Sequence, residues 1–315
     1  RREMKPLVHV LFPVGLAGGS RRNLTEALNK VTIEVDLAKR RCLECNELTF
    51  KTKCPRCGAE TVVEKSCPQC GRRLKESYCP ICQVPTRSYE KQLVNLKELM
   101  DEACRKLNVP IPELVKGVKG LTNETKTAEI LEKGILRAKH DLSVFKDGTI
   151  RFDVTNAPLT HFKATEIGVP VEKLQQLSYY YDCDGNSLTD LGQICELKVQ
   201  DVIIPLKSAE YFVRVANFLD ELLEKVYELP PYYNVKRIDD LVGHLVVGLA
   251  PHTSVGIIGR IIGFTRLNVC YAHPLWHSAK RRDCDGDEDT LMLALDTILN
   301  FSKAYLPAQI GGIMD

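Results

Sequence analysis

The sequence has no run approaching the ~18 consecutive apolar residues that a membrane-spanning helix needs. Its N-terminus also lacks the order of segments that marks a secretory signal peptide. We therefore expect an intracellular chain without a membrane anchor. An apolar content of 44% over 315 residues excludes a disordered chain and is enough for two or three domains with cores of their own.

A strong net charge is also missing, because 43 Lys and Arg against 41 Asp and Glu leave only +2. The charge is nevertheless unevenly distributed. Residues 1–90 hold 17 basic against 10 acidic residues, a local +7, and residues 91–315 hold 26 against 31, a local −5. The basic part can bind a phosphate backbone, and the acidic part concentrates its charge where a metal ion would sit.

The N-terminal glycines do not form a phosphate-binding loop. Residues 7–20 have the pattern of a strand followed by a loop with Gly15, Gly18 and Gly19, but no Gly-Lys-Ser/Thr follows. We therefore expect a structural turn here, then a short helix over residues 23–30 and a half-buried strand over residues 31–37.

Cysteine is abundant, and eight of the 13 cysteines fall into four Cys-x-x-Cys pairs within 41 residues. The pairs are Cys42/Cys45, Cys54/Cys57, Cys67/Cys70 and Cys79/Cys82. An intracellular chain with this spacing and with Pro, Arg and Gly in the knuckles favours zinc over disulfides. Two tetrahedral Zn²⁺ sites formed by neighbouring pairs are the simplest assignment, although the middle two pairs could also share an ion.

The stretch 280–289 places five acids within seven residues, directly behind Lys280, Arg281 and Arg282. Carboxylates this close repel one another unless a cation neutralises them, and hard divalent cations prefer oxygen ligands. Gly286 lets the backbone turn so that Asp285 and Asp287 can face one ion. A helix is expected directly afterwards, with its positive end near the acids. A solvated acidic turn is the alternative, whereas an EF-hand fails on spacing.

Other segments are assigned from their periodicity. We expect a helix over residues 88–108, a β-hairpin over residues 135–154 turning at Asp147-Gly148, and an amphipathic helix over residues 208–229. Short β-branched runs with glycines over residues 241–264 suit a tightly wound barrel. Asp182-Cys183-Asp184-Gly185 is interpreted as a turn.

The segment Tyr271 to Arg282, running into the acids, resembles the large catalytic subunit of the archaeal-type D-family DNA polymerases. The hallmark of that family is Asn-Cys-Asp-Gly-Asp-Glu-Asp after a His-x-Ala-Lys-Arg-Arg segment. The Asp-x-Asp-Gly-Asp pattern is also similar to the metal loop of multisubunit RNA polymerases, which lies on a double-psi β-barrel. Asp283 departs from the pattern, because the family usually has Asn there, and this leaves open whether Asp283 is a spectator or a third metal ligand.

The resemblance implies the chemistry of nucleotidyl transfer with two Mg²⁺ bound by Asp285 and Asp287. It also implies that Lys116 and Lys119, in the Lys-Gly-x-Lys-Gly segment, point at these acids and either hold the incoming triphosphate or screen the developing charge. Without the resemblance, both would be interpreted as lysines of a turn. The basic run Lys280-Arg281-Arg282 would contact nucleic acid or triphosphate. The implied partners are a DNA primer-template, dNTPs, a small proofreading subunit and, through other parts of the protein, a sliding clamp. The implied location is the cytoplasm, in association with the nucleoid.

The fold implied by the resemblance is α+β and β-rich, with two double-psi β-barrels, connecting helices and small zinc-ribbon modules before them. The expected layout is the end of an upstream domain (1–37), two zinc modules (38–87), a connecting helix (88–110), a first barrel (111–207), a helix (208–230) and a second, truncated barrel with the metal loop (231–315). We expect an excised catalytic portion with little primer extension in isolation.

Two other classes of function remain open. A fragment of a multisubunit RNA polymerase would share the barrel and the metal loop, and would differ in using ribonucleotides. A non-catalytic zinc-ribbon module that binds nucleic acid would account for residues 38–85 but would leave Asp285 to Asp289 without a role.

Overall fold

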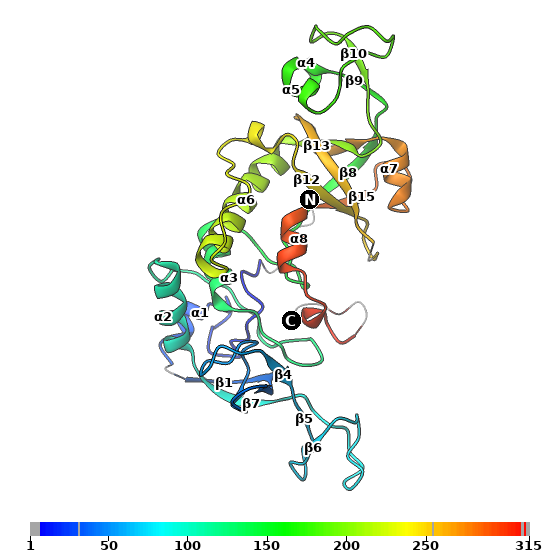
Figure 1. The fold of residues 1–315 in the computed structure, drawn as a ribbon. Helices are drawn as coiled ribbons and strands as arrows, with labels where there is room; N and C mark the ends of the chain where they lie inside the picture. The colour runs from blue at the N-terminus through cyan, green and yellow to red at the C-terminus, as the bar shows by residue number, and fades with distance from the viewer. Residues whose placement is uncertain (1–6, 31, 254, 310–311, 313–315) are drawn as a thin grey trace. The chain divides into compact units, whose positions relative to one another are not determined.

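The computed structural model describes residues 7–30, 32–253, 255–309 and 312. The chain forms two compact units (Figure 1). We call Ile150–Glu224 with Leu229–Leu299 the barrel unit. We call Lys5–Thr149 with Lys225–Glu228 and Asn300–Asp315 the zinc unit.

The zinc unit is built from short antiparallel sheets and three helices. Its strands are β1 (Thr32–Ala38), β2 (Arg40–Cys42), β3 (Leu48–Thr49), β4 (Thr61–Val63), β5 (Lys65–Ser66), β6 (Arg73–Leu74) and β7 (Tyr89–Asn95). Strand β1 pairs with β7, β2 lies between β3 and β4, and β5 pairs with β6. The helices are α1 (Leu24–Ala27), α2 (Leu96–Leu107) and α3 (Leu131–Lys139), with a 3-10 turn, η2 (Lys303–Tyr305).

The start of the described chain only partly matches expectation. Strand β1 and the short helix α1 are where the pattern predicts them, and Asn23 caps α1 by accepting a hydrogen bond from Thr25 N–H. The run 7–14, predicted as a strand, instead makes an isolated bridge, Pro13 to Val118. Its backbone groups bond to the segment 116–119 one at a time, so no continuous ladder develops.

The helix predicted over residues 88–108 is wrong in its first half. Residues 89–95 form β7, which pairs along its whole length with β1. The side chain of Asn95 accepts a hydrogen bond from Glu98 N–H, so the helix begins only after this cap. Leu93, placed on the apolar stripe of the predicted helix, is 76% exposed on the strand.

The hairpin predicted over residues 135–154 is also wrong. Residues 131–139 form α3, which buries Leu131, Ile135 and Leu136. The turn itself is confirmed, since Gly148 has a φ of +92° and donates its N–H to Phe145 O. The chain therefore passes from a helix, rather than from a strand, into this turn.

The barrel unit contains a closed barrel of six strands in the order β11-β13-β12-β15-β8-β14. Figure 1 labels β8, β12, β13 and β15 of this barrel. The strands are β8 (Phe152–Pro158), β11 (Asp201–Pro205), β12 (Leu245–Leu249), β13 (Ile257–Thr265), β14 (Val269–Ala272) and β15 (Glu288–Leu293). The pairs β11/β13 and β14/β8 are parallel, and the other neighbours are antiparallel. Closure leaves no strand edge of the barrel unpaired.

This barrel does not follow the predicted boundary between residues 207 and 231. Strands β8 and β11 fall in the range 111–207, and the other four follow residue 231. All six belong to one closed sheet, because the neighbours of β8 and β11 in it are all strands from the later range. The residues 111–149 belong instead to the zinc unit. A mixed, strand-rich α+β fold is observed, and the double-psi topology stays a prediction.

The barrel unit also contains further helices and strands. They are α4 (Ala164–Ile167), α5 (Val171–Gln176), the paired strands β9 (His161–Lys163) and β10 (Ile194–Glu196), α6 (Leu206–Val226), η1 (Ile238–Leu241), α7 (Pro274–Ala279) and α8 (Ala294–Asn300). Helix α6 confirms the predicted amphipathic helix and buries Phe212, Val215 and Leu219. The turn predicted at residues 182–185 is also confirmed, since Asp182 accepts the backbone N–H groups of Asp184 and Asn186.

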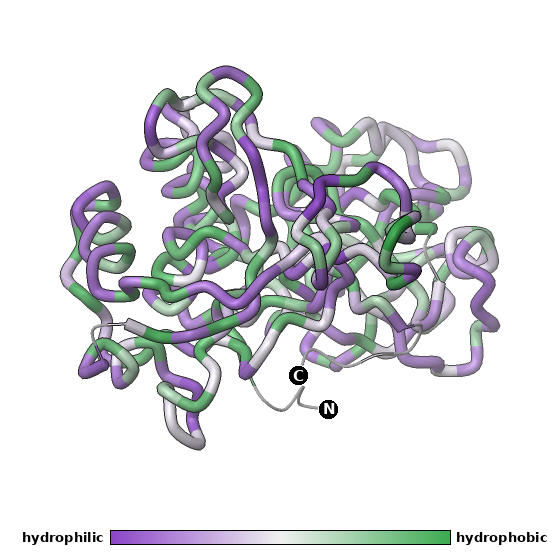
Figure 2. The backbone as a smooth tube through the Cα atoms, turned by 90° about the horizontal axis from the view of Figure 1, so that it is seen from below, coloured by the Kyte–Doolittle hydropathy of each residue, from purple (hydrophilic) through white to green (hydrophobic). Residues whose placement is uncertain are grey.

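Hydrophobic and hydrophilic residues are interspersed along the backbone of both units (Figure 2). Among the described residues, no helix combines the length and the apolar character required to span a bilayer.

Candidate functional site

The eight paired cysteines form two groups of four in the zinc unit. One group is Cys42, Cys45, Cys54 and Cys57, and the other is Cys67, Cys70, Cys79 and Cys82. Within each group all four sulfur atoms lie within 4.8 Å of one another. The assignment of neighbouring pairs is thereby confirmed, and a site shared by the middle two pairs is excluded.

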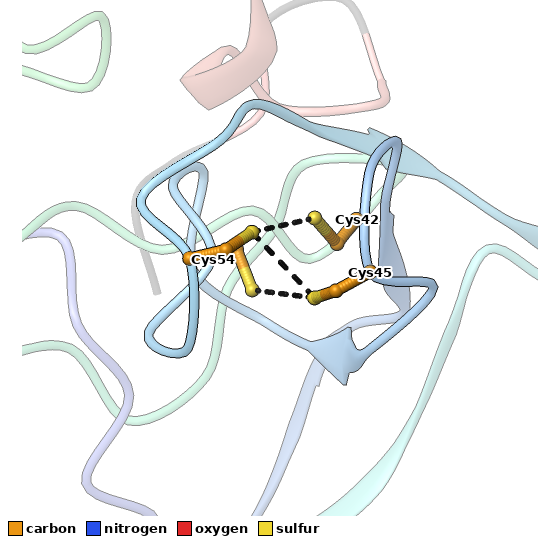
Figure 3. Close-up of side chains that lie close together, drawn as sticks. Cys42, Cys45 and Cys54 are labelled. Atoms are coloured by element: carbon orange, nitrogen blue, oxygen red, sulfur yellow. Dashed lines mark hydrogen bonds between the residues drawn. The ribbon is translucent and has the colours of Figure 1, made fainter.

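The spacing of the sulfur atoms fits a zinc ion. In the first group Cys42 Sγ lies 3.4 Å from Cys57 Sγ, and Cys45 Sγ lies 3.5 Å from Cys54 Sγ. Figure 3 shows the side chains of Cys42, Cys45 and Cys54 close together. In the second group Cys70 Sγ lies 3.8 Å from Cys79 Sγ. A tetrahedron with Zn–S bonds of about 2.3 Å has edges of about 3.8 Å, so little movement would admit the ion.

The first cysteine of each module is stabilised in the thiolate form that binds metal, whereas burial and the neighbouring thiols raise the pKa values of Cys45 and Cys82. Hydrogen bonds from backbone N–H groups, chiefly that of Cys45, lower the pKa of Cys42 to about 6. The corresponding donor, Cys70 N–H, does the same for Cys67. Each group of four could therefore bind one zinc ion with the first thiol of each module already inclined to ionise.

Glu64 links the two modules electrostatically. Its carboxylate accepts hydrogen bonds from Arg41 and lies 3.3 Å from Arg73 Nε and 3.9 Å from Lys39 Nζ. The hydrogen bond from Arg41 is the main cause that lowers the pKa of Glu64. Arg41 and Arg73 thus share an internal carboxylate partner.

The acidic loop, defined as residues 281–287, connects α7 to β15 in the barrel unit. Asp285 is exposed, and Asp287 is half-buried and lies 3.3 Å from Arg282 through Oδ2 and Nη1. Gly286 has a φ of +95°, a conformation that side chains rarely adopt, so the expected turn between the two aspartates is present.

The helix expected directly after the acids is not there. Residues 288–293 form β15, and α8 begins only at Ala294. The positive end of a helix therefore does not neutralise the acidic loop. The assignment failed because Leu291 and Leu295 satisfy a helical period, while residues 288–293 pair with β8 and β12.

Lys280 and Asp289 form a buried ion pair at the base of the loop. Lys280 is 2% exposed and Asp289 is 1% exposed, and the Lys280 Nζ lies 3.7 Å from the centroid of the Trp276 ring. Burial outweighs the attraction of Asp289 and lowers the pKa of Lys280. Lys280 is thus a structural residue in this fold, contrary to the expected contact with phosphate, and Asp289 lies on a strand rather than on a helix.

Sequence reasoning missed Asn156, a buried residue on β8. Its backbone N–H donates to Asp287 O at 2.9 Å, and its Nδ2 donates to Asp283 O at 3.1 Å. Asn156 is 129 residues before Asp285, and no motif surrounds it. Only the register of β8 against its neighbours brings it to the loop.

Lys116 and Lys119 lie in the zinc unit, on a segment that runs beside residues 9–15. His9 N–H donates to Lys116 O at 2.8 Å, and His9 Nδ1 accepts from Lys116 N–H at 3.2 Å. Burial, helped by the Lys116 charge, lowers the pKa of His9 to about 4, so His9 is a neutral acceptor. Gly117 is required here, because a Cβ would lie 2.6 Å from Phe12 O. The backbone of this segment is therefore tightly held.

The donor chemistry of the acidic loop suits Mg²⁺. Within the described ranges, three or more metal-binding side chains gather only in the two cysteine groups. Mg²⁺ does not need such a cage, because it is usually bound by one or two carboxylates together with water and substrate phosphates. Asp285 and Asp287 can supply these two carboxylates, whereas Asp283 has no demonstrated role.

Comparison with known proteins places the chain in a family. Residues 108–315 match the model for "DNA polymerase II large subunit DP2, catalytic domain", and residues 1–76 match the model for the central domain of the same subunit. The whole chain aligns with the DNA polymerase II large subunits of Archaeoglobus fulgidus (52% identical), Pyrococcus furiosus (51%) and Cenarchaeum symbiosum (46%). It spans 28%, 26% and 28% of their respective lengths. On this match the chain belongs to the family of the DNA polymerase II large subunit, over its catalytic domain and part of its central domain.

Proposed function

We propose that this chain is the catalytic core of a replicative DNA-directed DNA polymerase. It would transfer a nucleotidyl group from a dNTP to a primer 3′-OH with release of pyrophosphate. The observation that carries the proposal is the acidic loop, on which Asp285 and Asp287 flank a Gly286 turn at the end of a closed barrel within the matched catalytic domain. An acidic turn without a function would not need two buried anchors, Asn156 and the Lys280–Asp289 pair, behind it.

The roles of the residues follow from their charge and exposure. Asp285 and Asp287 would bind two Mg²⁺, and Arg282, 3.3 Å from Asp287, would restrain that carboxylate until the ions enter. When bound, the two Mg²⁺ lower the pKa of the primer 3′-OH and neutralise charge on the leaving pyrophosphate. Lys116 and Lys119 would hold the triphosphate oxygens. The side chain of Asp283 is exposed. We propose that it can add a third carboxylate to the metal site but is not required for metal binding.

Other partners are proposed for the longer protein to which such a chain belongs. DNA primer-template and dNTPs are the substrates that this chemistry requires. A small proofreading subunit and a sliding clamp are proposed as protein partners.

Primer extension by the full-length protein, supplied with any partner subunit it needs, tests this function. We expect Mg²⁺-dependent extension with dNTPs and about 100-fold less with ribonucleotides, the order of discrimination that a shaped site achieves against one added hydroxyl. Equal or better use of ribonucleotides would favour the RNA polymerase alternative. DNA binding without any metal-dependent synthesis would favour the zinc-ribbon module.

The two lysines provide a second prediction. Lys116→Ala or Lys119→Ala should lower kcat/KM for dNTP by about 10- to 1,000-fold, since each removes one charge-assisted contact rather than a metal site. Steady-state kinetics on the full-length polymerase, with dNTP concentration varied, measures this effect. Lys53→Ala is the control, because Lys53 is an exposed lysine in the first zinc module. A full rate for both Lys116 and Lys119 variants would remove them from the proposed site.

A further inference from the structure

Asn156 holds the acidic loop at two points. Its backbone N–H and its side-chain Nδ2 donate to the carbonyl oxygens of Asp287 and Asp283, at 2.9 and 3.1 Å. The two accepting groups stand at opposite sides of Cys284, Asp285 and Gly286. A single residue, 1% exposed, therefore fixes both ends of the segment that carries the exposed carboxylate.

The orientation of the Asn156 amide follows from its surroundings. If the amide were turned round, its oxygen would face the Asp283 carbonyl oxygen, and two acceptors would repel each other. In the observed orientation Oδ1 is buried and has no hydrogen-bond partner within the described part of the chain. The donor half of the amide thus makes the contact that explains a buried amide at this position.

The strand that carries Asn156 is itself immobilised. Strand β8 lies between β14, which pairs Cys270 with Asn156, and β15, which pairs Glu288 with Thr155. At the ends of the loop, Lys280 and Asp289 are joined by their buried ion pair beneath Trp276. The acidic loop is consequently held to the barrel at Lys280 and Asp289, which flank it, and at Asp283 and Asp287 within it.

We propose that Asn156 is a positioning residue for catalysis, which sets the separation of Asp283 and Asp287 and so directs the carboxylates of Asp285 and Asp287. This inference rests on the proposed polymerase function. Neighbouring carboxylates repel one another and would spread the loop when no cation is bound. The two hydrogen bonds from Asn156 oppose that spreading, so the carboxylates are already arranged when metal and dNTP arrive.

Two variants of Asn156 separate its hydrogen bond from its volume. Asn156→Asp keeps the shape but replaces the Nδ2 donor with an acceptor, and Asn156→Ala removes the amide without adding charge. Val154→Ala is the matched control, because Val154 is 2% exposed and shares a face of β8 with Asn156. Truncation of Val154 removes buried volume from the same strand but no hydrogen bond to the loop.

In the full-length polymerase, we expect both Asn156 variants to lower kcat about 10- to 100-fold with unchanged affinity for DNA, as for misplaced catalytic groups. The Mg²⁺ concentration at half-maximal rate should rise. Amide hydrogen exchange across residues 281–288, measured without metal, should become about 5- to 10-fold faster, the effect of one lost hydrogen bond. Val154→Ala should change neither kcat nor this exchange.

Three results would overturn the inference. The first is a normal kcat together with normal amide exchange of the loop in Asn156→Ala. The second is faster loop exchange in Asn156→Ala without any loss of kcat. The third is a loss of kcat in Val154→Ala equal to that in the Asn156 variants, which would indicate general weakening of the barrel. If Asn156→Asp does not fold, Asn156→Ala still decides between the outcomes. Asp285→Ala in the same assay distinguishes the two proposals: normal activity in that variant refutes the proposed function, whereas an inactive Asp285→Ala beside a normal Asn156→Ala refutes only the inference.

Discussion

Replacing Asp285 or Asp287 with Ala should lower the rate of primer extension at least ~10³-fold, the loss expected when a metal-binding carboxylate is removed from a nucleotidyl-transfer site. Each change removes one of the two carboxylates that are proposed to bind both ions. In Asp287→Ala, Arg282, which lies 3.3 Å from Asp287, would also lack its carboxylate partner and add positive charge where a metal ion should bind. Single-turnover extension by the full-length polymerase at saturating dNTP measures this loss directly.

DNA binding should persist in both variants, because removing acids near phosphates cannot weaken the electrostatic attraction. Asp184→Ala is a suitable control, since Asp184 is an exposed acid in the similar sequence Asp182-Cys183-Asp184-Gly185, which forms only a turn. This variant should extend primers at the normal rate. A near-normal rate for Asp285→Ala would refute the assignment of the site outright.

Features that depend on local chemistry were predictable from the sequence. The pairing of the cysteines follows from four Cys-x-x-Cys spacings, and α6 follows from a helical period sustained over about six turns. The turn at Gly148 was identified correctly because Asp-Gly is a local signal, although the element before it is a helix. Each of these depends on residues close together in the chain.

Features that depend on distant partners were not predictable. Residues 89–95 form a strand because β1, more than 50 residues earlier, offers a complete ladder. Residues 288–293 form a strand because β8 and β12 lie on both sides of them. Single-chain periodicity could not distinguish these cases, since Leu93 and Leu291 also fit a helical stripe.

The candidate site shows the same division. The aspartates and their Gly286 turn are visible as a motif, and so is the basic run before them. The structural role of Lys280 in that run could not be predicted, because its burial depends on contacts with Trp276 and Asp289. Asn156 carries no sequence signal at all, because its contact arises from strand register in a barrel that joins residues 152–158 to residues 288–293.

Removal of zinc should unfold the two cysteine modules. We expect two Zn²⁺ per chain by elemental analysis, since eight thiolates in two closed groups leave no ligand over. A structural zinc ion contributes about 10–16 kcal/mol of binding free energy at neutral pH, and strands of two or three residues such as β3, β5 and β6 cannot replace that stabilisation. A chelator strong enough to remove both ions should abolish the ordered structure of residues 40–87, detected as loss of amide protection.

A single substitution makes the zinc prediction specific to one module. Cys54→Ser should reduce the zinc content from two ions to about one, because three thiolates and a hydroxyl bind zinc far more weakly. Amide protection should then decrease in the first module, while the second module, with Cys67, Cys70, Cys79 and Cys82, keeps its ion. Cys104→Ser is the matched control, since Cys104 is a buried thiol on α2 outside both groups, and this variant should retain two ions. Two zinc ions in Cys54→Ser, or fewer than two in the natural chain, would show that these thiols are not closed zinc sites.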